Sequence, residues 1–269
     1  MSDNAQPLLR THGLSVRYGG VVANTDIDIA VDAGEIVGLI GPNGAGKTTF
    51  VDAVTGFTEY TGSVTLDGIV LDRLGTHRRR RAGLARTWQA GELFGDLTVA
   101  QNLAVAIQPA GLRTLFADIV GRSVPPSETI DAALELVGVP GVAAQRPDEL
   151  ALGQQKLVGV ARALVGGSKV VLLDEPAAGL DTHESREFGR HLRRIAAAGI
   201  GVLLIDHDMS LVLDTCARLY VLDFGAVIAA GEPARIREDP RVIAAYLGTT
   251  RPDGNDSAAQ PARPAGDSK

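Results

Sequence analysis

The sequence predicts an α/β protein in which a mostly parallel, doubly wound sheet carries an added antiparallel β layer and an inserted helical subdomain. The first observation is a set of segments that are apolar on both faces, as central parallel strands are: "EIVGLIG" at 35–41, "KVVLLDE" at 169–175 and "GVLLIDHD" at 201–208. The second is a set of helical patterns around these segments, at 47–56, 128–138, 154–166 and 184–198.

The antiparallel layer is predicted from two segments with a different pattern. "DIDIAV" at 26–31 alternates polar and apolar residues, which is typical of a half-buried antiparallel strand. "SVTLDGIVL" at 63–71 repeats this alternation, and Asp67-Gly68 within it supplies a hairpin turn. Both segments are therefore expected outside the parallel core.

The helical subdomain is predicted over about 95–165. Residues 95–150 are helical in pattern, lack a strong strand signal and are interrupted by "GRSVPPSE" at 121–128. We expect a single folded domain over 1–249. Residues 250–269 are rich in Pro, Gly, Asp and Ala and have little to bury, which predicts a disordered tail.

Composition excludes several classes of protein. Of the 269 residues, 45% are hydrophobic and only 4% aromatic, which is enough for one large aliphatic core. The formal charge of −6 argues against a nucleic-acid partner. Cys216 is the only cysteine, so we expect a reducing, cytosolic setting without disulfides or a cysteine-based metal cluster. No stretch reaches the ~20 apolar residues that cross a bilayer, and residues 1–10 lack a signal-peptide core.

A phosphate-binding loop is predicted at "GPNGAGKTT", residues 41–49. It matches the pattern G-x-x-x-x-G-K-[ST] and lies between a buried strand and a helix, the context that the pattern requires. Its glycines let backbone N–H groups point at phosphate oxygens, and the helix start near Lys47 adds its positive dipole end. Lys47 is expected on the β- and γ-phosphates and the Thr48 hydroxyl on Mg²⁺. The nucleotide-binding residues are therefore Gly41, Pro42, Asn43, Gly44, Ala45, Gly46, Lys47, Thr48 and Thr49.

Two carboxylates follow the next strongly buried segment, "VVLLDEP" at 170–176. The carboxyl edge of an α/β sheet faces the ligand crevice, so Asp174 and Glu175 are expected beside the phosphate loop. Asp174 is predicted to hold the hydration shell of Mg²⁺, and Glu175 to orient and partly deprotonate the attacking water. Without a phosphate loop nearby, the same two residues would simply end a strand in solvent.

A polar Gly-Gln-Gln sequence in "ELALGQQK", residues 149–156, lies at the head of an apolar-periodic helix. That helix packs in the core, since Leu157, Val160, Ala161, Leu164 and Val165 recur at helical spacing. Its first turn therefore stands at a surface and presents backbone N–H groups either to water or to a phosphate.

Six motifs in order resemble the ATP-binding subunits of ABC transporters. They are the phosphate loop, Gln89 in "RTWQ", "LALGQ" at 150–154, "LLDEP", "AAGLD" at 177–181, and His207 in "LLIDHD". The resemblance covers about residues 8–248. It implies a P-loop NTPase (RecA-like) core, an ABC-type nucleotide-binding domain over 1–249, and ATP and Mg²⁺ as cofactors.

The resemblance also implies a head-to-tail dimer that sandwiches two nucleotides. The signature residues Leu150, Ala151, Leu152, Gly153 and Gln154 would cap the ATP that is held by the phosphate loop of a second subunit. A helix N-terminus with Gly153 allows the close backbone approach that this role needs. Asp181 would contact the second subunit, although alone it reads as a helix N-cap.

The remaining family roles fall on three residues. Tyr18 would stack on adenine, whereas without the resemblance it reads as a surface tyrosine at a strand edge. Gln89 would ligate Mg²⁺ and couple the site to the membrane subunit. His207 would donate a hydrogen bond to the γ-phosphate. Glu175, His207 and Gln89 are therefore the expected catalytic residues.

The signature departs from the usual L-S-G-G-Q pattern of the family. Ala151 and Leu152 replace its serine and first glycine. Loss of a hydroxyl that bonds a charged phosphate costs about 1.5–3 kcal/mol. Because the backbone donors and the helix dipole remain, we expect weaker capping rather than none.

Three other features resemble functional motifs and are interpreted as structural. Asp223-Phe224-Gly225 spells the metal-binding tripeptide of kinases, but apolar runs flank it, which favours a hairpin turn. The run Arg78–Arg81 is interpreted mainly as a solvated helix face, with a role in binding as the alternative. Histidines 12, 77, 183 and 191 lack metal-ligand spacing and are expected at the surface.

Within the family, the chain resembles the subunits that serve branched-chain amino acid importers. The resemblance rests on "RTWQ", "LALGQQ", "LLIDHDM", the C-terminal segment "GEPARIREDPRVIAAYLG", and extra helical material at 107–125. Trp88 stands where this branch usually has Phe. Urea or amide importers and the ATPase of lipopolysaccharide export share much of the pattern.

This branch implies particular partners and a place in the cell. Expected partners are membrane permease subunits, a second identical or paralogous ATP-binding subunit and, indirectly, an extracytoplasmic solute-binding protein. The chain would act at the cytoplasmic face of the membrane without a transmembrane segment of its own. The alternatives are a soluble ABC ATPase without transport, the ATPase of a lipid-export ABC system, and a P-loop kinase, which the signature helix and His207 oppose.

Overall fold

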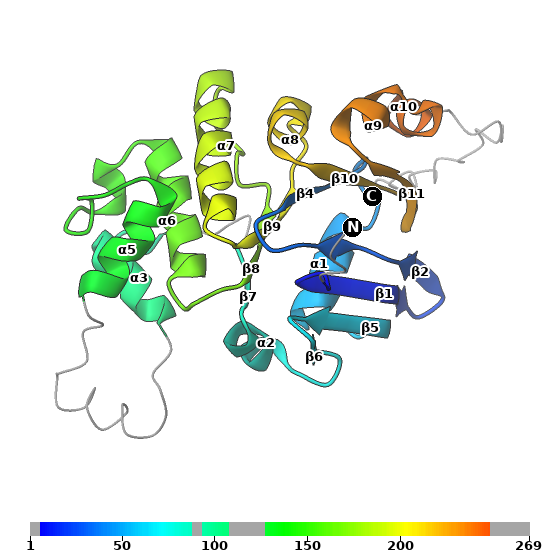
Figure 1. The fold of residues 1–269 in the computed structure, drawn as a ribbon, viewed down its shortest axis with the longest axis horizontal. Coiled ribbons are helices and arrows are strands. Elements are labelled where there is room, and N and C mark those ends of the chain that lie inside the picture. The colour runs from blue at the N-terminus through cyan, green and yellow to red at the C-terminus, as the bar shows by residue number, and fades with distance from the viewer. Residues whose placement is uncertain (1–5, 88–92, 108–126, 248–269) are drawn as a thin grey trace, which may run out of the picture.

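The computed structural model describes residues 6–87, 93–107 and 127–247, which form two sheets with helices around them (Figure 1). The larger sheet has six strands in the order β11-β10-β4-β9-β8-β7. Neighbouring strands from β10 to β7 pair in parallel, and β11 adds antiparallel to β10. Its strands are β4 (Ile36–Ile40), β7 (Leu84–Arg86), β8 (Val170–Asp174), β9 (Gly201–Ile205), β10 (Arg218–Asp223) and β11 (Ala226–Gly231).

The three predicted central strands are confirmed. Every residue of β4, β8 and β9 is buried, as the apolar runs indicated. Their side chains divide by alternation between two hydrophobic clusters, one on each face of the sheet, as the strand geometry requires. Ile36 and Ile40 of β4, for example, lie in one cluster, and Val37 and Leu39 lie in the other. The parallel core is therefore covered on both faces.

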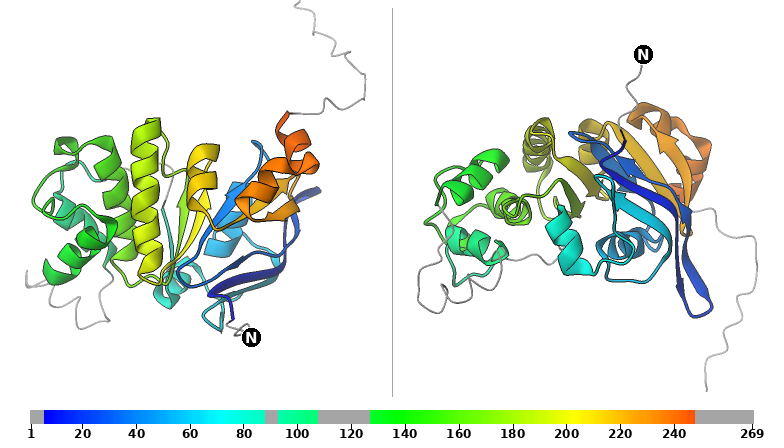
Figure 2. Two further views of the ribbon diagram at one scale, coloured as in Figure 1. Left: turned by 45° about the horizontal axis from the view of Figure 1, so that its top comes forward. Right: turned by 60° about the horizontal axis from the view of Figure 1, so that its bottom comes forward.

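Helices cover the two faces unequally (Figure 2). α1 (Lys47–Thr55) packs with the antiparallel sheet on one face, while α6 (Leu152–Leu164), α7 (Thr182–Ala197) and α8 (Met209–Thr215) contribute to the cluster on the other. All four predicted helices are present; those expected at 154 and 184 begin two residues earlier. The remaining helices are α2 (Thr76–Ala82), α3 (Val99–Ala106), α5 (Ser127–Val137), a short 3₁₀ helix (Pro147–Glu149), α9 (Pro233–Glu238) and α10 (Pro240–Leu247).

The antiparallel sheet lies beside the parallel core, and one of its predicted strands is corrected. Its order is β2-β1-β5-β6, with β3 also paired to β1. "DIDIAV" is not one strand, because Thr11 interrupts it: the Thr11 hydroxyl donates to Ile27 O (3.0 Å) and accepts from Ile29 N (2.9 Å). The strands are β1 (Leu9–Tyr18), β2 (Val21–Ile27), β3 (Ala30–Val31), β5 (Thr61–Leu66) and β6 (Ile69–Val70).

Both predicted hairpin turns are confirmed by their backbone geometry. Asp67 (φ 48°) and Gly68 (φ 75°) connect β5 to β6, and Phe224 (φ 42°) and Gly225 (φ 79°) connect β10 to β11. Two successive residues with positive φ are the mark of a tight hairpin turn. The kinase-like tripeptide is therefore a turn.

The helices between β7 and β8 pack together at the left of Figure 1. α5 contacts α6 and α3, and all three contribute to the cluster on the α7 side of the sheet. Asn102, a fully buried residue of α3, holds the preceding loop through Phe94 N, Phe94 O and Leu97 O. These elements fall inside the 95–165 range, whose limits as a subdomain stay a prediction.

Several predictions fall on residues outside the described ranges. They are Trp88, Gln89, the helical material at 108–125, and the disordered tail at 250–269. His12, His77 and His183 are exposed as expected, and His191 is partly buried. Across the described ranges, no helix is both long and apolar enough to span a bilayer.

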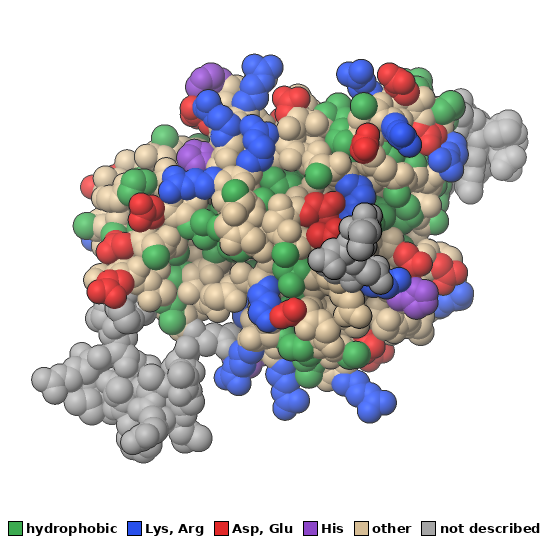
Figure 3. Space-filling view, viewed as in Figure 1, with side chains coloured by type: hydrophobic (Ala, Val, Ile, Leu, Met, Phe, Trp, Pro, Cys, Tyr) green, Lys and Arg blue, Asp and Glu red, His purple; other side chains and the backbone are tan. Residues whose placement is uncertain are grey.

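The interpretation of Arg78–Arg81 as a solvated helix face is wrong for Arg79. Its side chain is buried, with 3% of the residue exposed, and reaches the C-terminal end of α1. The guanidinium donates to Ala53 O (3.0 Å), Val54 O (2.7 Å) and Leu74 O (2.7 Å). Arg78 and Arg81 remain exposed, and Figure 3 shows Lys and Arg side chains projecting around α2. Arg79 therefore ties α2 to the carbonyl end of α1.

We expect Arg79→Met to lower the free energy of unfolding by about 3 kcal/mol, because buried carbonyls of α1 lose a charged donor. Urea unfolding followed by circular dichroism measures this change. Arg78→Met is the matched control and should stay within about 0.5 kcal/mol of the wild type. Equal stability of the two variants would contradict the structural role of Arg79.

Candidate active site

The phosphate loop joins β4 to α1, and two of its glycines are required by close contacts. Gly41 (φ 151°) lies so near β10 that an added Cβ would be 2.1 Å from Leu222 O. At Gly46 (φ 98°), a Cβ would be 2.6 Å from the side-chain nitrogen of Asn24. Gly44 (φ 80°) faces open space instead. At the two ends of the loop, glycine is therefore required because a side chain would clash with neighbouring atoms. At the tip, it is favoured because the backbone has a positive φ.

The β10–β11 turn and strand β2 hold the phosphate loop in place through hydrogen bonds. Gly225 N donates to Ala45 O (3.0 Å), and Gly225 O accepts from Thr25 N (2.8 Å). Asn24, fully buried on β2, donates from its side chain to Gly46 O (3.2 Å). The loop is thus held by the parallel core on one side and by the antiparallel layer on the other.

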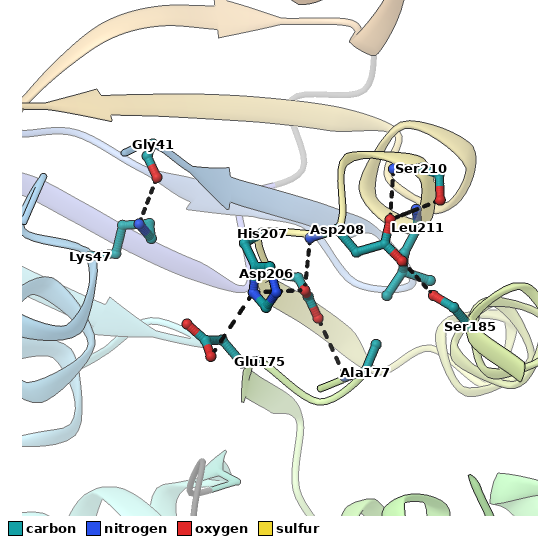
Figure 4. Close-up of polar contacts among 10 residues, drawn as sticks. All are labelled: Gly41, Lys47, Glu175, Ala177, Ser185, Asp206, His207, Asp208, Ser210 and Leu211. Carbon is teal, nitrogen blue, oxygen red and sulfur yellow. Dashed lines mark hydrogen bonds and ion pairs between the residues drawn. The ribbon is translucent and has the colours of Figure 1, made fainter. Parts of the chain in front are cut away.

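Lys47 begins α1 and folds back over the loop (Figure 4). Its ammonium donates to Gly41 O (2.6 Å) and Pro42 O (3.0 Å). Burial lowers the pKa of Lys47, while the negative charges of Glu175 and Asp174 act in the opposite direction. Thr48 is exposed beside it, and Thr49 is partly buried. The Lys47 ammonium is therefore bonded to the loop itself and lies within the electrostatic influence of both carboxylates.

The two carboxylates lie at the same edge of the sheet as the loop, because β8 pairs in parallel with β9, with Asp174 opposite Ile205, and β9 pairs in parallel with β4. Glu175 adopts φ 47° and its N–H donates to Ile205 O (2.7 Å), which turns the chain out of the sheet. His207 follows β9 and is exposed, with its Nδ1 4.0 Å from Glu175 Oε2 (Figure 4). The structure therefore brings Glu175 and His207 together, while their roles in hydrolysis stay a prediction.

Arg86 contributes to the site, and the sequence analysis missed it. Its guanidinium lies at the end of β7 and bonds Asp174 Oδ2 (3.0 Å) as well as the carboxylate of Asp52 on α1. Arg86 and Asp174 each expose 7% of their side chains. This pair fixes Asp174 against the helix that follows the phosphate loop. "RTWQ" was the only signal, and it drew attention to Gln89 instead.

The other predicted site residues lie on separate elements. Tyr18 ends β1, is half exposed and hydrogen-bonds the Thr58 hydroxyl (3.1 Å). Asp181 is the N-cap of α7 and accepts from His183 N (2.7 Å) and Glu184 N (2.8 Å). The hydrogen bond from Glu184 N is the largest cause of a lowered pKa of Asp181, and the bond from His183 N lowers this pKa further. Its capping role is confirmed, while its contact with a second subunit stays a prediction.

The signature residues begin α6 at the surface. Ala151 is the N-cap and provides no side-chain acceptor for the first turn. Instead, Gln154 Oε1 accepts from Ala151 N (3.1 Å), and the Gln155 amide donates to Leu150 O (3.0 Å). Gly153 has open space where a side chain would be. Leu152 is 41% exposed, and its side chain lies beside Gly179 of the "AAGLD" loop.

The donors in this site fit Mg²⁺ that is bound together with phosphates. Within the described residues, no group of three or more His, Cys, Asp or Glu side chains is arranged to hold a metal by itself. Mg²⁺ is usually held by one or two protein oxygens together with substrate phosphates and waters. The Thr48 hydroxyl and the Asp174 carboxylate are oxygen donors of that kind.

A glycine-rich loop between a buried strand and a helix, a lysine folded over it, and a carboxylate at the end of β8, which is separated from β4 by β9, define a P-loop nucleotide-hydrolysing protein. Comparison with known families is consistent with this class: the family described as ABC transporter matches residues 24–178. The chain belongs to the ABC transporter family and is one of its ATPases. A second family, described as branched-chain amino acid ATP-binding cassette transporter, matches residues 226–251.

Relatives match over almost their whole length. The chain is 40% identical over 253 residues to the high-affinity branched-chain amino acid transport ATP-binding protein LivG of Salmonella typhimurium, covering 91% of this chain and 99% of that protein. It is 37% identical over 255 residues to BraF of Pseudomonas aeruginosa, which has the same description, with the same coverage. The lipopolysaccharide export system ATP-binding protein LptB of Haemophilus influenzae is 31% identical, covering 90% and 97%.

Solved structures agree with the fold. A nucleotide-free ATP-binding cassette from an ABC transporter superposes with a TM-score of 0.78 at 29% identity, covering 90% of this chain and all of that one. An ATP-binding cassette in its ADP conformation gives 0.79 at 29% identity, covering 91% and 100%. The predicted fold class is therefore confirmed.

We expect Ala151→Ser to raise the free energy of unfolding by about 1 kcal/mol, because serine supplies the N-cap acceptor that α6 lacks. Urea unfolding measures the change. Ala151→Val is the control, because valine is as poor an N-cap as alanine. A serine variant no more stable than the valine variant would show that the first turn is already satisfied.

Proposed function

We propose that this chain is the ATP-hydrolysing motor subunit of an importer of branched-chain amino acids or a related small polar solute. It would act on membrane permease subunits at the cytoplasmic face, with an extracytoplasmic solute-binding protein delivering the solute. The observation that carries the proposal is the C-terminal match at 226–251 to a branched-chain amino acid transporter family. Relatives that carry the same description match over 99% of their length.

Each site residue has an expected role in hydrolysis; Gln89, which lies outside the described residues, has its role from the family resemblance alone. The loop N–H groups and Lys47 would bind the phosphates, while Thr48, Asp174 and Gln89 would hold Mg²⁺, which neutralises charge on the phosphates. Glu175 would accept a proton from the attacking water. His207, 4.0 Å from Glu175, would donate to the γ-phosphate from its exposed ring. Arg86 would keep the Asp174 carboxylate in place.

A sandwich dimer is supported by where the two nucleotide-binding elements lie. α1 carries the phosphate loop and packs in one hydrophobic cluster, whereas α6 carries the signature and packs in the other, across the six-stranded sheet. Figures 1 and 2 both show strands between α1 and α6. The signature of one chain would therefore serve the phosphate loop of another, identical or paralogous subunit.

The second candidate function is lipid export. It would rest on the 31% identity to a lipopolysaccharide export ATPase over 90% of this chain. The 40% identity to the amino acid transport proteins and the separate C-terminal match favour import.

Glu175→Gln should lower the ATP turnover rate by about 10²–10⁴-fold while ATP binding survives, because the amide cannot act as a general base. Phosphate release and equilibrium binding of a fluorescent ATP analogue measure the two quantities. The same variant should be monomeric without nucleotide and dimeric with ATP and Mg²⁺ in sedimentation velocity. Unchanged turnover would remove Glu175 from its role, and a sedimentation coefficient that ignores ATP would contradict the sandwich.

Import is tested by uptake in the source cell. A strain that lacks this chain should lose high-affinity uptake of labelled leucine, isoleucine and valine, and the wild-type chain should restore it. Lys47→Ala is the matched control and should not restore uptake, because it removes the phosphate-binding cation. Normal uptake of all three amino acids in the deletion strain, with loss of urea or amide uptake or of lipopolysaccharide export, would assign the chain to another branch.

A further inference from the structure

Asp206 is a buried carboxylate between the two elements that carry the catalytic residues. It directly follows β9 and precedes His207. Only 2% of the residue is exposed. Burial of a carboxylate is costly unless its oxygens are hydrogen-bonded, so its partners indicate what holds it there. Among the residues that the structure describes, none of these partners is a lysine or an arginine.

The two oxygens of Asp206 contact two different loops (Figure 4). Oδ2 accepts from Ala177 N (3.3 Å), two residues after Glu175. Oδ1 accepts from Asp208 N (3.0 Å), the residue after His207, and lies 3.7 Å from the Nδ1 atom of the His207 ring. One carboxylate therefore joins the loop of Glu175 to the loop of His207.

Local turn formation explains only part of this arrangement. The bond to Asp208 N spans two residues and is the kind of contact by which aspartate stabilises a turn. The bond to Ala177 N spans 29 residues and connects the ends of two neighbouring parallel strands. The main-chain pairing of β8 and β9 ends at Asp174 and Ile205. One further backbone hydrogen bond, from Glu175 N to Ile205 O, extends it. Beyond that point, Asp206 supplies the connection.

We propose that Asp206 is a positioning residue that sets the separation of Glu175 and His207 by bonding the backbone of both loops. The proposal rests on the catalytic roles assigned to these two residues under the proposed function. It places Asp206 behind the reacting groups, without contact to nucleotide. A change at Asp206 should therefore act on the rate of hydrolysis and leave phosphate binding by the loop at 41–49 nearly intact.

Asp206→Asn tests the proposal with little change in volume. The amide offers one acceptor and one NH₂ donor, so a donor must face the N–H of either Ala177 or Asp208. We expect kcat for ATP hydrolysis to fall by about 10–10²-fold, with the Kd for a fluorescent ATP analogue within about threefold of the wild type. Asp206→Glu keeps both acceptors and the charge but moves them by one methylene, and should give a smaller loss of kcat. If Asp206→Asn does not fold, Asp206→Glu tests the proposal by itself: kcat should fall while the Kd for the ATP analogue stays near the wild-type value.

Ser185→Ala is the matched control. Its hydroxyl donates to Asp208 Oδ2 (2.8 Å), so the variant removes one hydrogen bond from the same loop without touching the Asp206 carboxylate. We expect its kcat to stay within about twofold of the wild type, at a comparable loss of stability in urea unfolding. If Ser185→Ala and Asp206→Asn lower kcat equally, the effect is general loosening of the loop and the proposal is wrong.

Double-mutant cycles separate positioning from independent effects. If Asp206 acts through Glu175 and His207, adding Asp206→Asn to Glu175→Gln or to His207→Ala should lower kcat much less than it does in the wild type. Full multiplicative losses in both cycles would overturn the proposal, as would an unchanged kcat in Asp206→Asn. Should Glu175→Gln alone keep its turnover, the base role of Glu175 fails, and the cycle with His207→Ala decides the role of Asp206.

Discussion

The parallel pairing of β4, β9 and β8 is the constraint on which the site depends. Leu39 of β4 lies opposite Ile205 of β9, and Ile205 lies opposite Asp174 of β8. The three strands therefore end at one edge of the sheet, although their ends are far apart in the sequence. The phosphate loop, His207 and Glu175 each follow one of these strands within three residues. Because every residue of the three strands is buried, a shift in register would expose or displace core side chains.

Strand ends alone do not hold loops, and each loop here has a second attachment. The phosphate loop is supported by the β10–β11 turn through Gly225 and by the antiparallel layer through Asn24. Glu175 has the left-handed backbone (φ 47°) that non-glycine residues rarely adopt, a conformation that persists only where surrounding bonds impose it. The bond from Glu175 N to Ile205 O is one such bond, and the contact of Asp206 with Ala177 N is a second.

Sequence reasoning succeeded where the signal was local and failed where partners came from distant elements. The buried strands, the phosphate loop and the two hairpin turns each lie within about ten residues, so their patterns could be interpreted directly. Arg79 looked like part of a solvated run because nothing in the sequence shows that the C-terminal carbonyls of α1 lie within its reach. "DIDIAV" kept its strand-like alternation, but its break depends on the Thr11 hydroxyl of a neighbouring strand.

Among the site residues, the same division holds. Asp174 and Glu175 could be predicted because they end an apolar run, and the structure places Glu175 beside His207. Arg86 and Asp206 were missed because each acts by joining groups from separate elements: Arg86 joins Asp52 to Asp174, and Asp206 joins Ala177 to Asp208. A sequence motif marks positions along the chain, whereas these residues are defined by what folding brings around them.

The loop from Glu175 to Asp181 connects two functions that the proposed dimer would need to link. Its first residue is the expected base, and its last is the N-cap of α7 and an expected contact with the second subunit. Between them, Gly179 lies beside Leu152 at the start of the signature helix, so that an added Cβ would be 3.3 Å from the leucine side chain. Asp206 holds the same loop at Ala177. Closure of a partner over α6 and Asp181 would press on a segment of seven residues, from Glu175 to Asp181, which Asp206 holds at Ala177. In the proposed dimer, the contact with a second subunit and the position of the Glu175 carboxylate would therefore depend on the same short segment.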